Sequence, residues 1–259
     1  MTFEVPPHDV HVWCAFCDEI RDEALLEAYE RLLSADERER RSRFVFPRDR
    51  HRFLVTRALV RTVLSRYADV APADWTFVAD THGRPEIAPR HARAAGLSFN
   101  VSHTPGLVVL GVGCGRPLGV DTEHVRSRQA PLGVAERFFA PAEAAALRAL
   151  PEADQSRRFF EYWTVKESYA KARSLGLSLP LRDFAVQFIG DRGVALSVDG
   201  EISNAVSPWQ LWQFSVAEDH LVAVCAGRTG PGQARLVLRS VVPLQAEEDL
   251  DARELRTSG

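Results

Sequence analysis

Lysine is nearly absent from this chain. The 259 residues contain 32 lysines and arginines in total, and only Lys166 and Lys171 are lysines. The other 32 − 2 = 30 cations are arginines. A lysine ammonium is a compact charge with three rotatable donors, whereas an arginine guanidinium is a planar fork. Two lysines five positions apart therefore indicate a site that needs the compact charge.

Other absences exclude whole classes of protein. No apolar run approaches the roughly 20 residues of a membrane-spanning helix, and the acidic start MTFEVPPHDV lacks the basic and apolar regions of a signal peptide. We therefore expect a cytoplasmic protein with no membrane partner. The net charge of −3 provides no basic excess for general nucleic-acid binding, so we expect no nucleic-acid partner.

Cysteines are few, but two of them have a suggestive spacing. Cys14 and Cys17 in WCAFC match the spacing of a thioredoxin-type redox motif. The surrounding residues alternate as in a strand, where positions three apart face opposite sides. We therefore favour a structural role for both cysteines. Cys114 and Cys225 lie in or just after apolar strands and are interpreted as small core or strand-end residues.

The stretch from Phe159 to Lys171, FFEYWTVKESYAK, contains both lysines. Glu167 and Lys171 stand four apart, so on a helix they share one face, and Trp163 lies one turn before Glu167 on the same side. One interpretation is an ordinary surface ion pair beside a core tryptophan. The other interpretation depends on a second acidic stretch upstream.

Asp121 and Glu123 follow an apolar approach in LGVDTE, as in a strand, and residues two apart on a strand point to the same side. Two carboxylates on one face repel each other unless a positive charge lies between them. Together with Glu167 they form a hard-oxygen ligand set with room for waters and phosphate oxygens. The sequence therefore predicts a magnesium site.

Three motifs, FNVSH, GVDTE and WTVKESYAK, together resemble the Sfp type of 4′-phosphopantetheinyl transferase, the two-lobed enzymes that activate carrier proteins of polyketide, peptide and fatty-acid synthesis. The resemblance extends from the first strand to beyond residue 226. It implies an α+β fold, a pseudo-twofold duplication of two similar α/β lobes with a cleft between them. We expect a monomer with an internal pseudo-dimer. The arginine and alanine richness suggests a secondary-metabolism host, consistent with polyketide or nonribosomal peptide biosynthesis.

The implied reaction moves the 4′-phosphopantetheine arm of coenzyme A to a serine of an apo acyl or peptidyl carrier protein and releases adenosine 3′,5′-bisphosphate. The resemblance implies Mg2+ on Asp121, Glu123 and Glu167, with Lys171 on the phosphates. Glu167, or a water bound to magnesium, takes the serine proton. Lys166 is either a leaving-group acid or part of an ion pair behind the site.

The resemblance also assigns residues to coenzyme A. Arg40 and Arg52 match the cations that hold the 3′-phosphate, and Arg84 stands in HGRP where the family has Gly-Lys-Pro. Ser102 and His103 in FNVSH match donors to the phosphates. Each residue also has a plain structural interpretation: ADERERRSRF as a solvated helix face, HGRP as a turn, and the histidine as a strand-end residue.

The two halves of the chain show the same order of elements. We predict a helix, a hairpin and a strand pair twice. The predicted segments are a first strand ending at Phe16; helices at Asp18–Leu33 and Arg50–Tyr67; a Ser34–Glu37 capping box; a hairpin at 75–88; strands at Leu97–Val101 and Leu107–Val112; a helix at Arg157–Ser174; a hairpin in FAVQFIGDRGVALSV; and strands in LWQFSV and LVAVCAG.

These segments predict three regions. Residues 1–115 form an N-terminal lobe on the coenzyme A side, and residues 116–228 form a C-terminal lobe with the magnesium and catalytic residues. Residues 229–259 form an extension with one strand-like run at Arg235–Val242 and a mobile acidic tail.

One motif departs from the family pattern. The family continues after the second lysine as Lys-x-x-Gly-x-Gly-Leu, whereas this chain has Ser174 at the first glycine and continues through Gly176 and Leu177. Two other functions stay open at this stage. They are a non-catalytic module that binds coenzyme A or a carrier protein, and a metal-dependent phosphohydrolase.

Overall fold

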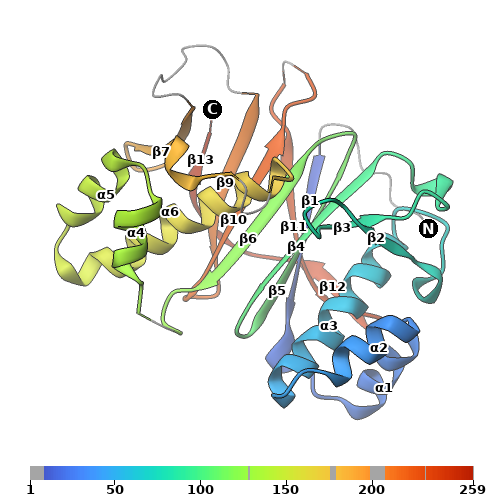
Figure 1. The fold of residues 1–259 in the computed structure, drawn as a ribbon. Helices are drawn as coiled ribbons and strands as arrows, with labels where there is room; N and C mark the ends of the chain where they lie inside the picture. Colours follow the sequence, from blue (N-terminus) through green and yellow to red (C-terminus); the bar gives the residue numbers. More distant parts are fainter. Residues whose placement is uncertain (1–8, 128, 176–178, 199–207, 231, 259) are drawn as a thin grey trace. The chain divides into compact units, whose positions relative to one another are not determined.

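A computed structural model describes residues 9–127, 129–175, 179–198, 208–230 and 232–258. The chain divides into two compact units: unit 1 comprises Met1–Gly115 and Arg235–Leu250, and unit 2 comprises Arg116–Ala234 and Asp251–Gly259. The predicted boundary after residue 115 coincides with this division. Each unit has its own sheet and its own helices (Figure 1). The predicted cleft between lobes stays a prediction.

Unit 1 contains a five-stranded sheet in the order β12-β11-β1-β5-β4 and a separate two-stranded sheet, β2-β3. β1 pairs antiparallel with β5 and parallel with β11. The strands are β1 Asp9–Phe16, β2 Phe77–Ala79, β3 Pro85–Ile87, β4 Leu97–Thr104, β5 Leu107–Cys114, β11 Arg235–Val242 and β12 Ala246–Asp249. The helices are α1 Glu23–Leu32, α2 Ala35–Ser42 and α3 Pro47–Leu64.

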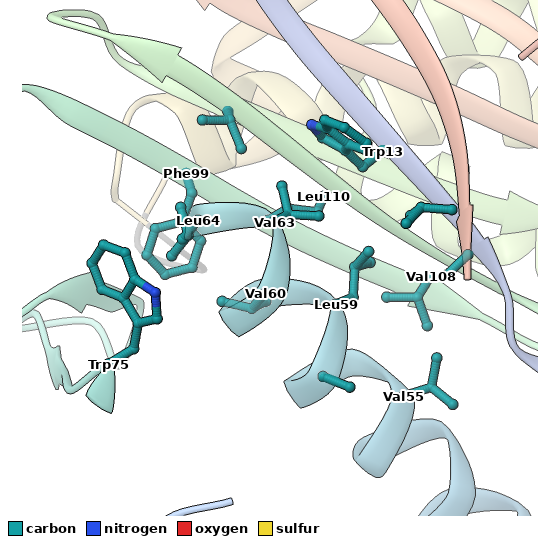
Figure 2. Close-up of a cluster of buried hydrophobic side chains, with 14 of the residues drawn as sticks. Trp13, Val55, Leu59, Val60, Val63, Leu64, Trp75, Phe99, Val108 and Leu110 are labelled. Carbon is teal, nitrogen blue, oxygen red and sulfur yellow. The ribbon is translucent and has the colours of Figure 1, made fainter. Parts of the chain in front are cut away.

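The core of unit 1 lies between α3 and the sheet. Figure 2 shows Val55, Leu59 and Val63 of α3 turned toward Val108 and Leu110 of β5. All five side chains are almost fully buried. The apolar spacing of the predicted helix therefore marks its sheet-facing side, as its periodicity requires.

Capping residues explain where the unit 1 helices begin. The Asp22 carboxylate accepts the Leu25 N–H, so α1 begins at Glu23, after a short 3-10 turn at Cys17–Glu19, and not at Asp18 as predicted. The predicted capping box at α2 is confirmed, because Ser34 accepts the Glu37 N–H and Glu37 accepts the Ser34 N–H. α3 begins at a proline, three residues before the predicted start.

Unit 2 contains a six-stranded sheet in the order β6-β10-β9-β13-β8-β7. The strands are β6 Leu118–His124, β7 Phe184–Ile189, β8 Gly193–Val198, β9 Trp209–Val216, β10 His220–Gly227 and β13 Arg253–Thr257. The helices are α4 Leu132–Phe138, α5 Pro141–Arg148 and α6 Glu152–Ala172, of which α6 packs on β6 and β10. The sequence predicted α6, with its start at residue 157, but neither α4 nor α5.

The predicted repetition of elements is confirmed within the described residues. A long helix, a hairpin and a strand pair occur as α3, β2-β3 and β4-β5, and again as α6, β7-β8 and β9-β10. The hairpins differ, because β2-β3 forms its own sheet whereas β7-β8 joins the main sheet of unit 2.

The prediction of a separate extension with a mobile acidic tail was wrong. β11 and β12 extend the sheet of unit 1, and β13 lies between β9 and β8 in unit 2 (Figure 1). The Arg256 guanidinium, mostly buried, donates to Gln213 Oε1 at 2.8 Å and to Glu161 Oε2 at 3.0 Å. Backbone pairing and this buried charge therefore fix the charged tail, which composition alone does not reveal.

The cysteines lack the properties of a redox motif. All four cysteines are free, and burial raises the pKa of the Cys14 thiol to about 12 and that of Cys17 to about 11. A redox motif needs a lowered thiol pKa, so the structural interpretation holds.

Among the described residues, no helix is both long and apolar enough to span a membrane.

Candidate active site

A glycine sets the distance between β6 and α6. A Cβ at Gly119 would lie 2.0 Å from the Ser168 carbonyl oxygen and 2.4 Å from the Ala172 backbone nitrogen. Both distances are far below van der Waals contact, so only glycine fits at this position. The strand backbone therefore lies directly against the last turns of α6, and this brings Asp121 within reach of Lys171.

Lys171 connects the two elements. Its Nζ donates to Asp121 Oδ1 at 2.7 Å and to the Val120 carbonyl oxygen at 3.1 Å. Asp121 is 6% exposed, so this ion pair is shielded from water on the aspartate side. A shielded, charge-assisted bond is stronger than an exposed one and fixes the ammonium in place.

Glu167 lies one turn before Lys171 on α6 and has an unusual acidity. Its pKa is raised to about 7, first by burial and then by the negative charges of Asp121 and Glu123, while Lys171 opposes the shift. The charges of Asp121 and Glu123 thus contribute to the raised pKa of Glu167, and the predicted convergence of the three carboxylates on one metal stays a prediction. A carboxyl group with a pKa near 7 exchanges a proton readily at neutral pH, which suits a general base.

The donor set has the chemistry of a magnesium site. The three carboxylates are hard oxygen ligands on two elements, the type that magnesium binds together with substrate phosphates. No three His, Cys, Asp or Glu side chains in the described ranges form a ready-made ligand set by themselves. The chemistry of the residues fits magnesium, with other ligands to come from water and substrate, and the metal assignment stays a prediction.

An apolar cavity of about 590 Å³ borders Glu167. Trp163, one turn before Glu167, also lines it, as predicted from their spacing. The other lining residues come from α4 and from the segment before β7: Val134, Arg137, Phe138, Leu179, Pro180, Leu181 and Arg182. The Glu167 carboxylate therefore borders a mostly apolar space.

Lys166 lies in the interior, fully buried. Its Nζ donates to both carboxylate oxygens of Glu143, at 2.9 and 2.8 Å, and to the Phe184 carbonyl oxygen at 2.7 Å. Glu143 also accepts the backbone N–H groups of Ala140 and Val186. Three acceptors satisfy the three donors of the ammonium. Of the two predicted roles, this geometry favours the ion pair over a leaving-group acid.

The predicted phosphate donors of unit 1 lie on or beside β4. Ser102 is buried and His103 is exposed, as neighbours on a strand that face opposite sides. Arg84 Nη2 donates to the Phe99 carbonyl oxygen on the same strand at 2.9 Å, and the Asp80 carboxylate holds the turn by accepting the Arg84 N–H. The structure thus brings Arg84 to the strand that carries FNVSH.

The two arginines predicted for the 3′-phosphate lie on different helices and have different contacts. Arg52 Nη2 lies 2.7 Å from Asp49 Oδ1. Arg40 lies over the Phe53 ring, with its Cζ 5.8 Å from the centroid. Sequence reasoning did not identify Arg57, which lies over the same ring.

Comparison with known families places both units. Residues 117–225 match the model described as "4'-phosphopantetheinyl transferase superfamily", and residues 21–114 match "4'-phosphopantetheinyl transferase, N-terminal". A transferase named HetI from Nostoc sp. is 37% identical over 170 residues, which cover 66% of this chain and 70% of the relative. The chain belongs to the 4′-phosphopantetheinyl transferase superfamily. The predicted resemblance is therefore confirmed.

Two further 4′-phosphopantetheinyl transferases, both from Bacillus subtilis, match a larger part of the chain. The transferase Sfp is 32% identical over 200 residues, which cover 77% of this chain and 84% of Sfp. The transferase ffp is 35% identical over 196 residues, with 76% and 83% covered. The N-terminal family model ends at residue 114 and the superfamily model begins at residue 117, so the two matches meet at the boundary of the two units.

Proposed function

We propose that this chain transfers the 4′-phosphopantetheine arm of coenzyme A to a serine hydroxyl of an apo acyl or peptidyl carrier protein. The serine oxygen forms a bond to the β-phosphorus, and the bond from this phosphorus to the bridging pyrophosphate oxygen breaks. The leaving group is adenosine 3′,5′-bisphosphate, and the serine proton passes to a base. Family membership supports the reaction class, and the raised pKa of Glu167 beside Asp121 and Lys171 supports the location.

Each residue has a proposed part in this reaction. Asp121, Glu123 and Glu167 are the groups that would hold magnesium, which when bound supplies positive charge for the pyrophosphate oxygens. Lys171, held by Asp121 and Val120, binds a phosphate oxygen. Glu167, or a water bound to the metal, would accept the serine proton. Positioning and charge neutralisation carry most of the catalysis in such displacements.

The test is the intact mass of several apo carrier proteins after incubation with coenzyme A, magnesium and this protein. We expect a gain of one phosphopantetheine per carrier protein and an equal amount of adenosine 3′,5′-bisphosphate. Asp121→Ala should lower the single-turnover rate by about 100- to 1000-fold, as loss of an electrostatic group at a reaction centre does. Full transfer in excess EDTA would contradict the magnesium assignment.

The same experiment separates the two alternatives. A binding module without activity retains coenzyme A or the carrier protein but leaves the mass of the carrier unchanged. A phosphohydrolase releases nucleotide or phosphate in the absence of any carrier protein. The raised pKa of Glu167 favours the transferase over a binding module, because binding alone does not need a carboxylate with a raised pKa.

A further inference from the structure

A polar cavity of about 730 Å³ lies in unit 2. Of its described lining residues, only Ala217 and Leu255 are apolar, and none is aromatic. Five of the side chains that line it are arginines: Arg126, Arg157, Arg192, Arg253 and Arg256. None of these residues has a part in the proposed transfer reaction. The cavity thus differs from the apolar one beside Glu167, and its charge indicates a different ligand.

A β-bulge turns two of these arginines toward one side of the sheet. On β13, Arg253 lies opposite Ser215 and Arg256 lies opposite Gln213, with a register shift between them. Ser215 and Gln213 stand two apart on β9, so they face the same side. Residues three apart on a regular strand face opposite sides, and the bulge removes this alternation. Both arginines therefore point to the side on which Gln213 donates to the Glu161 carbonyl oxygen of α6.

Positive charge exceeds negative charge where β13 lies near α6. The buried Glu161 carboxylate lies 3.4 Å from Arg157 Nε, 2.8 Å from Arg158 Nε and 3.0 Å from Arg256 Nη2. One carboxylate thus faces three guanidinium groups. Burial lowers the pKa of Arg256, Glu161 opposes this shift, and Arg158 adds to it. The surplus of positive charge favours an anion in the cavity.

Several donors of the cavity lack acceptors. Arg256 Nε is buried and donates no hydrogen bond to the described residues. Arg192 and Arg253 are exposed, and neither forms an ion pair in the described part of the chain. A buried donor without an acceptor costs free energy. An anion in the cavity supplies oxygen acceptors for these guanidinium groups.

The origin of the arginines favours a phosphate over a carboxylate. Arg157 comes from α6, Arg192 from the turn between β7 and β8, and Arg253 from β13. A carboxylate has two oxygens in one plane, whereas a phosphomonoester has three acceptor oxygens on a tetrahedral phosphorus. Cations from three segments therefore match a phosphate better.

Carboxylates of the same cavity indicate what the phosphate is attached to. Asp191, Glu218 and Glu254 are exposed and line it. Ionised carboxylates only accept hydrogen bonds, so they repel a second anion and bind hydroxyl groups. The described lining residues offer no ring on which a nucleotide base would stack. The volume of about 730 Å³ is that of a site for a small molecule, roughly 300–1,000 Å³. A phosphorylated polyol has the matching properties.

We propose that the polar cavity is a second ligand site, which binds a sugar phosphate. The arginines bind the phosphate, and the carboxylates accept hydrogen bonds from the sugar hydroxyls. Glu161 stands before Lys171 on α6 by about 15 Å along the helix axis, so the cavity is separate from the proposed transfer site. The inference therefore does not depend on the transfer reaction.

The experiment is isothermal titration calorimetry in EDTA at constant ionic strength, with ribose 5-phosphate, ribose, inorganic phosphate and citrate as probes. Ribose 5-phosphate should bind at least about tenfold more tightly than each of the other three. Arg192→Gln and Arg253→Gln should each raise its Kd at least about tenfold, because each removes a charge-assisted contact. Both arginines are exposed, so both variants should fold.

Two further variants sharpen the test. Arg148→Gln is the matched control, an exposed arginine of α5 that is not among the described lining residues, and it should change the Kd by less than about twofold. Glu218→Ala combined with Glu254→Ala should reduce the preference for ribose 5-phosphate over inorganic phosphate to less than about threefold, because it removes acceptors for the hydroxyls.

Each contrary result overturns the inference. Equal affinity for ribose 5-phosphate and inorganic phosphate in the wild type would mean an adventitious ion only, and equal affinity for citrate would mean a carboxylate site. No detectable binding of ribose 5-phosphate, or an unchanged Kd in both arginine variants, also overturns it. The same holds for an equal loss in Arg148→Gln and for an unchanged preference in the double variant. No coenzyme A or carrier protein takes part, so none of these results bears on the proposed transfer reaction.

Discussion

The long helices α3 and α6 bury the same kind of ion pair in the two units. In unit 1 the buried Arg61 binds Glu37, which stands at the third position of α2 and accepts the Ser34 N–H. In unit 2 the buried Lys166 binds Glu143, which stands at the third position of α5 and accepts the Ala140 N–H. In each unit, one carboxylate therefore caps a short helix and neutralises a cation of the long helix.

The units differ where the first strand meets the long helix. Trp13 of β1 lies opposite Leu110, the fourth residue of β5, and Asp121 of β6 lies opposite Ala223, the fourth residue of β10. Trp13 donates from Nε1 to the Tyr67 hydroxyl at 2.8 Å, whereas Asp121 accepts from Lys171. The Trp13 ring is part of the hydrophobic core of unit 1. In unit 2, Asp121 lies where β6 contacts α6, and we call this contact, with Asp121, Glu167 and Lys171, the reactive seam. The two units thus share an arrangement of strand and helix, and at the corresponding strand position unit 1 has a tryptophan where unit 2 has an aspartate.

The largest effect should come from removing the shared cation. Lys166→Met leaves the buried Glu143 carboxylate without its cation, which costs about 3–5 kcal/mol of unfolding free energy. Arg61→Met leaves Glu37 with one other cation, because Arg57 Nε lies 3.3 Å from Glu37 Oε1. Arg61→Met should therefore cost less than Lys166→Met, although it also removes the donors to the carbonyl oxygens of Pro72 and Trp75. Denaturant unfolding of each variant provides the measurement.

The second partner provides the control for this experiment. Lys166→Met combined with Glu143→Gln should recover a substantial part of the loss, since no unpaired charge remains. If either single variant costs less than about 1 kcal/mol, the two ion pairs are not equivalent structural elements.

A change at the strand–helix seam of unit 2 should have the next largest effect. Gly119→Ala places a Cβ within 2.0 Å of the Ser168 carbonyl oxygen, and such overpacking costs about 1–3 kcal/mol. It should also separate Asp121 from Lys171, so transfer activity should decrease even at temperatures where the variant is folded. Gly133→Ala is the matched control, because a Cβ there meets nothing within 4 Å.

The acidity of Glu167 gives a pH test of the reactive seam. Its folded pKa of about 7 exceeds its ordinary value of 4.5, so the folded state binds the proton more tightly than the unfolded state does. The native state therefore loses stability as pH rises from about 4.5 through 7. In EDTA, Glu167→Gln should be more stable than the wild type at pH 8 by about 1–2 kcal/mol and equally stable near pH 4. A difference that does not vary with pH would contradict the shift.

The smallest effect concerns the ends of the two long helices. Ser174 follows α6 with φ of 52°, whereas Ser65 at the end of α3 has φ of −66°. Glycine adopts a positive φ without strain, so Ser174→Gly should stabilise the protein by about 0.5–1 kcal/mol. Ser65→Gly should destabilise it, because glycine gains nothing at a negative φ and the change also removes the hydroxyl that accepts the Trp75 indole N–H. Thermal unfolding of both variants tests the contrast, and stabilisation by both would mean that backbone conformation is not the cause.

Local sequence patterns predicted most of the elements. Alternation identified β1, and Ser34 with Glu37 identified the start of α2. The short helices α4 and α5 were missed, and α5 has no side-chain cap to mark it because Ala140 precedes its first proline. The tail was misassigned because β12 and β13 are charged segments, and their pairing partners are distant in sequence. Gly176 and Leu177, the rest of the unusual motif after Lys171, lie outside the described residues.

The sequence by itself determined the family, the order of the elements and the acidic and basic groups of the seam, because these follow from residue type and spacing along one strand or one helix. The tertiary structure decided which group each cation meets. Lys166 and Lys171 are five residues apart on α6, yet one binds Glu143 in the interior and the other binds Asp121 at the seam. Arg52 pairs with Asp49 on its own helix, whereas Arg57 shares the Phe53 ring with Arg40. Spacing along a helix fixes the direction of a side chain, but the packing of other elements decides its partner.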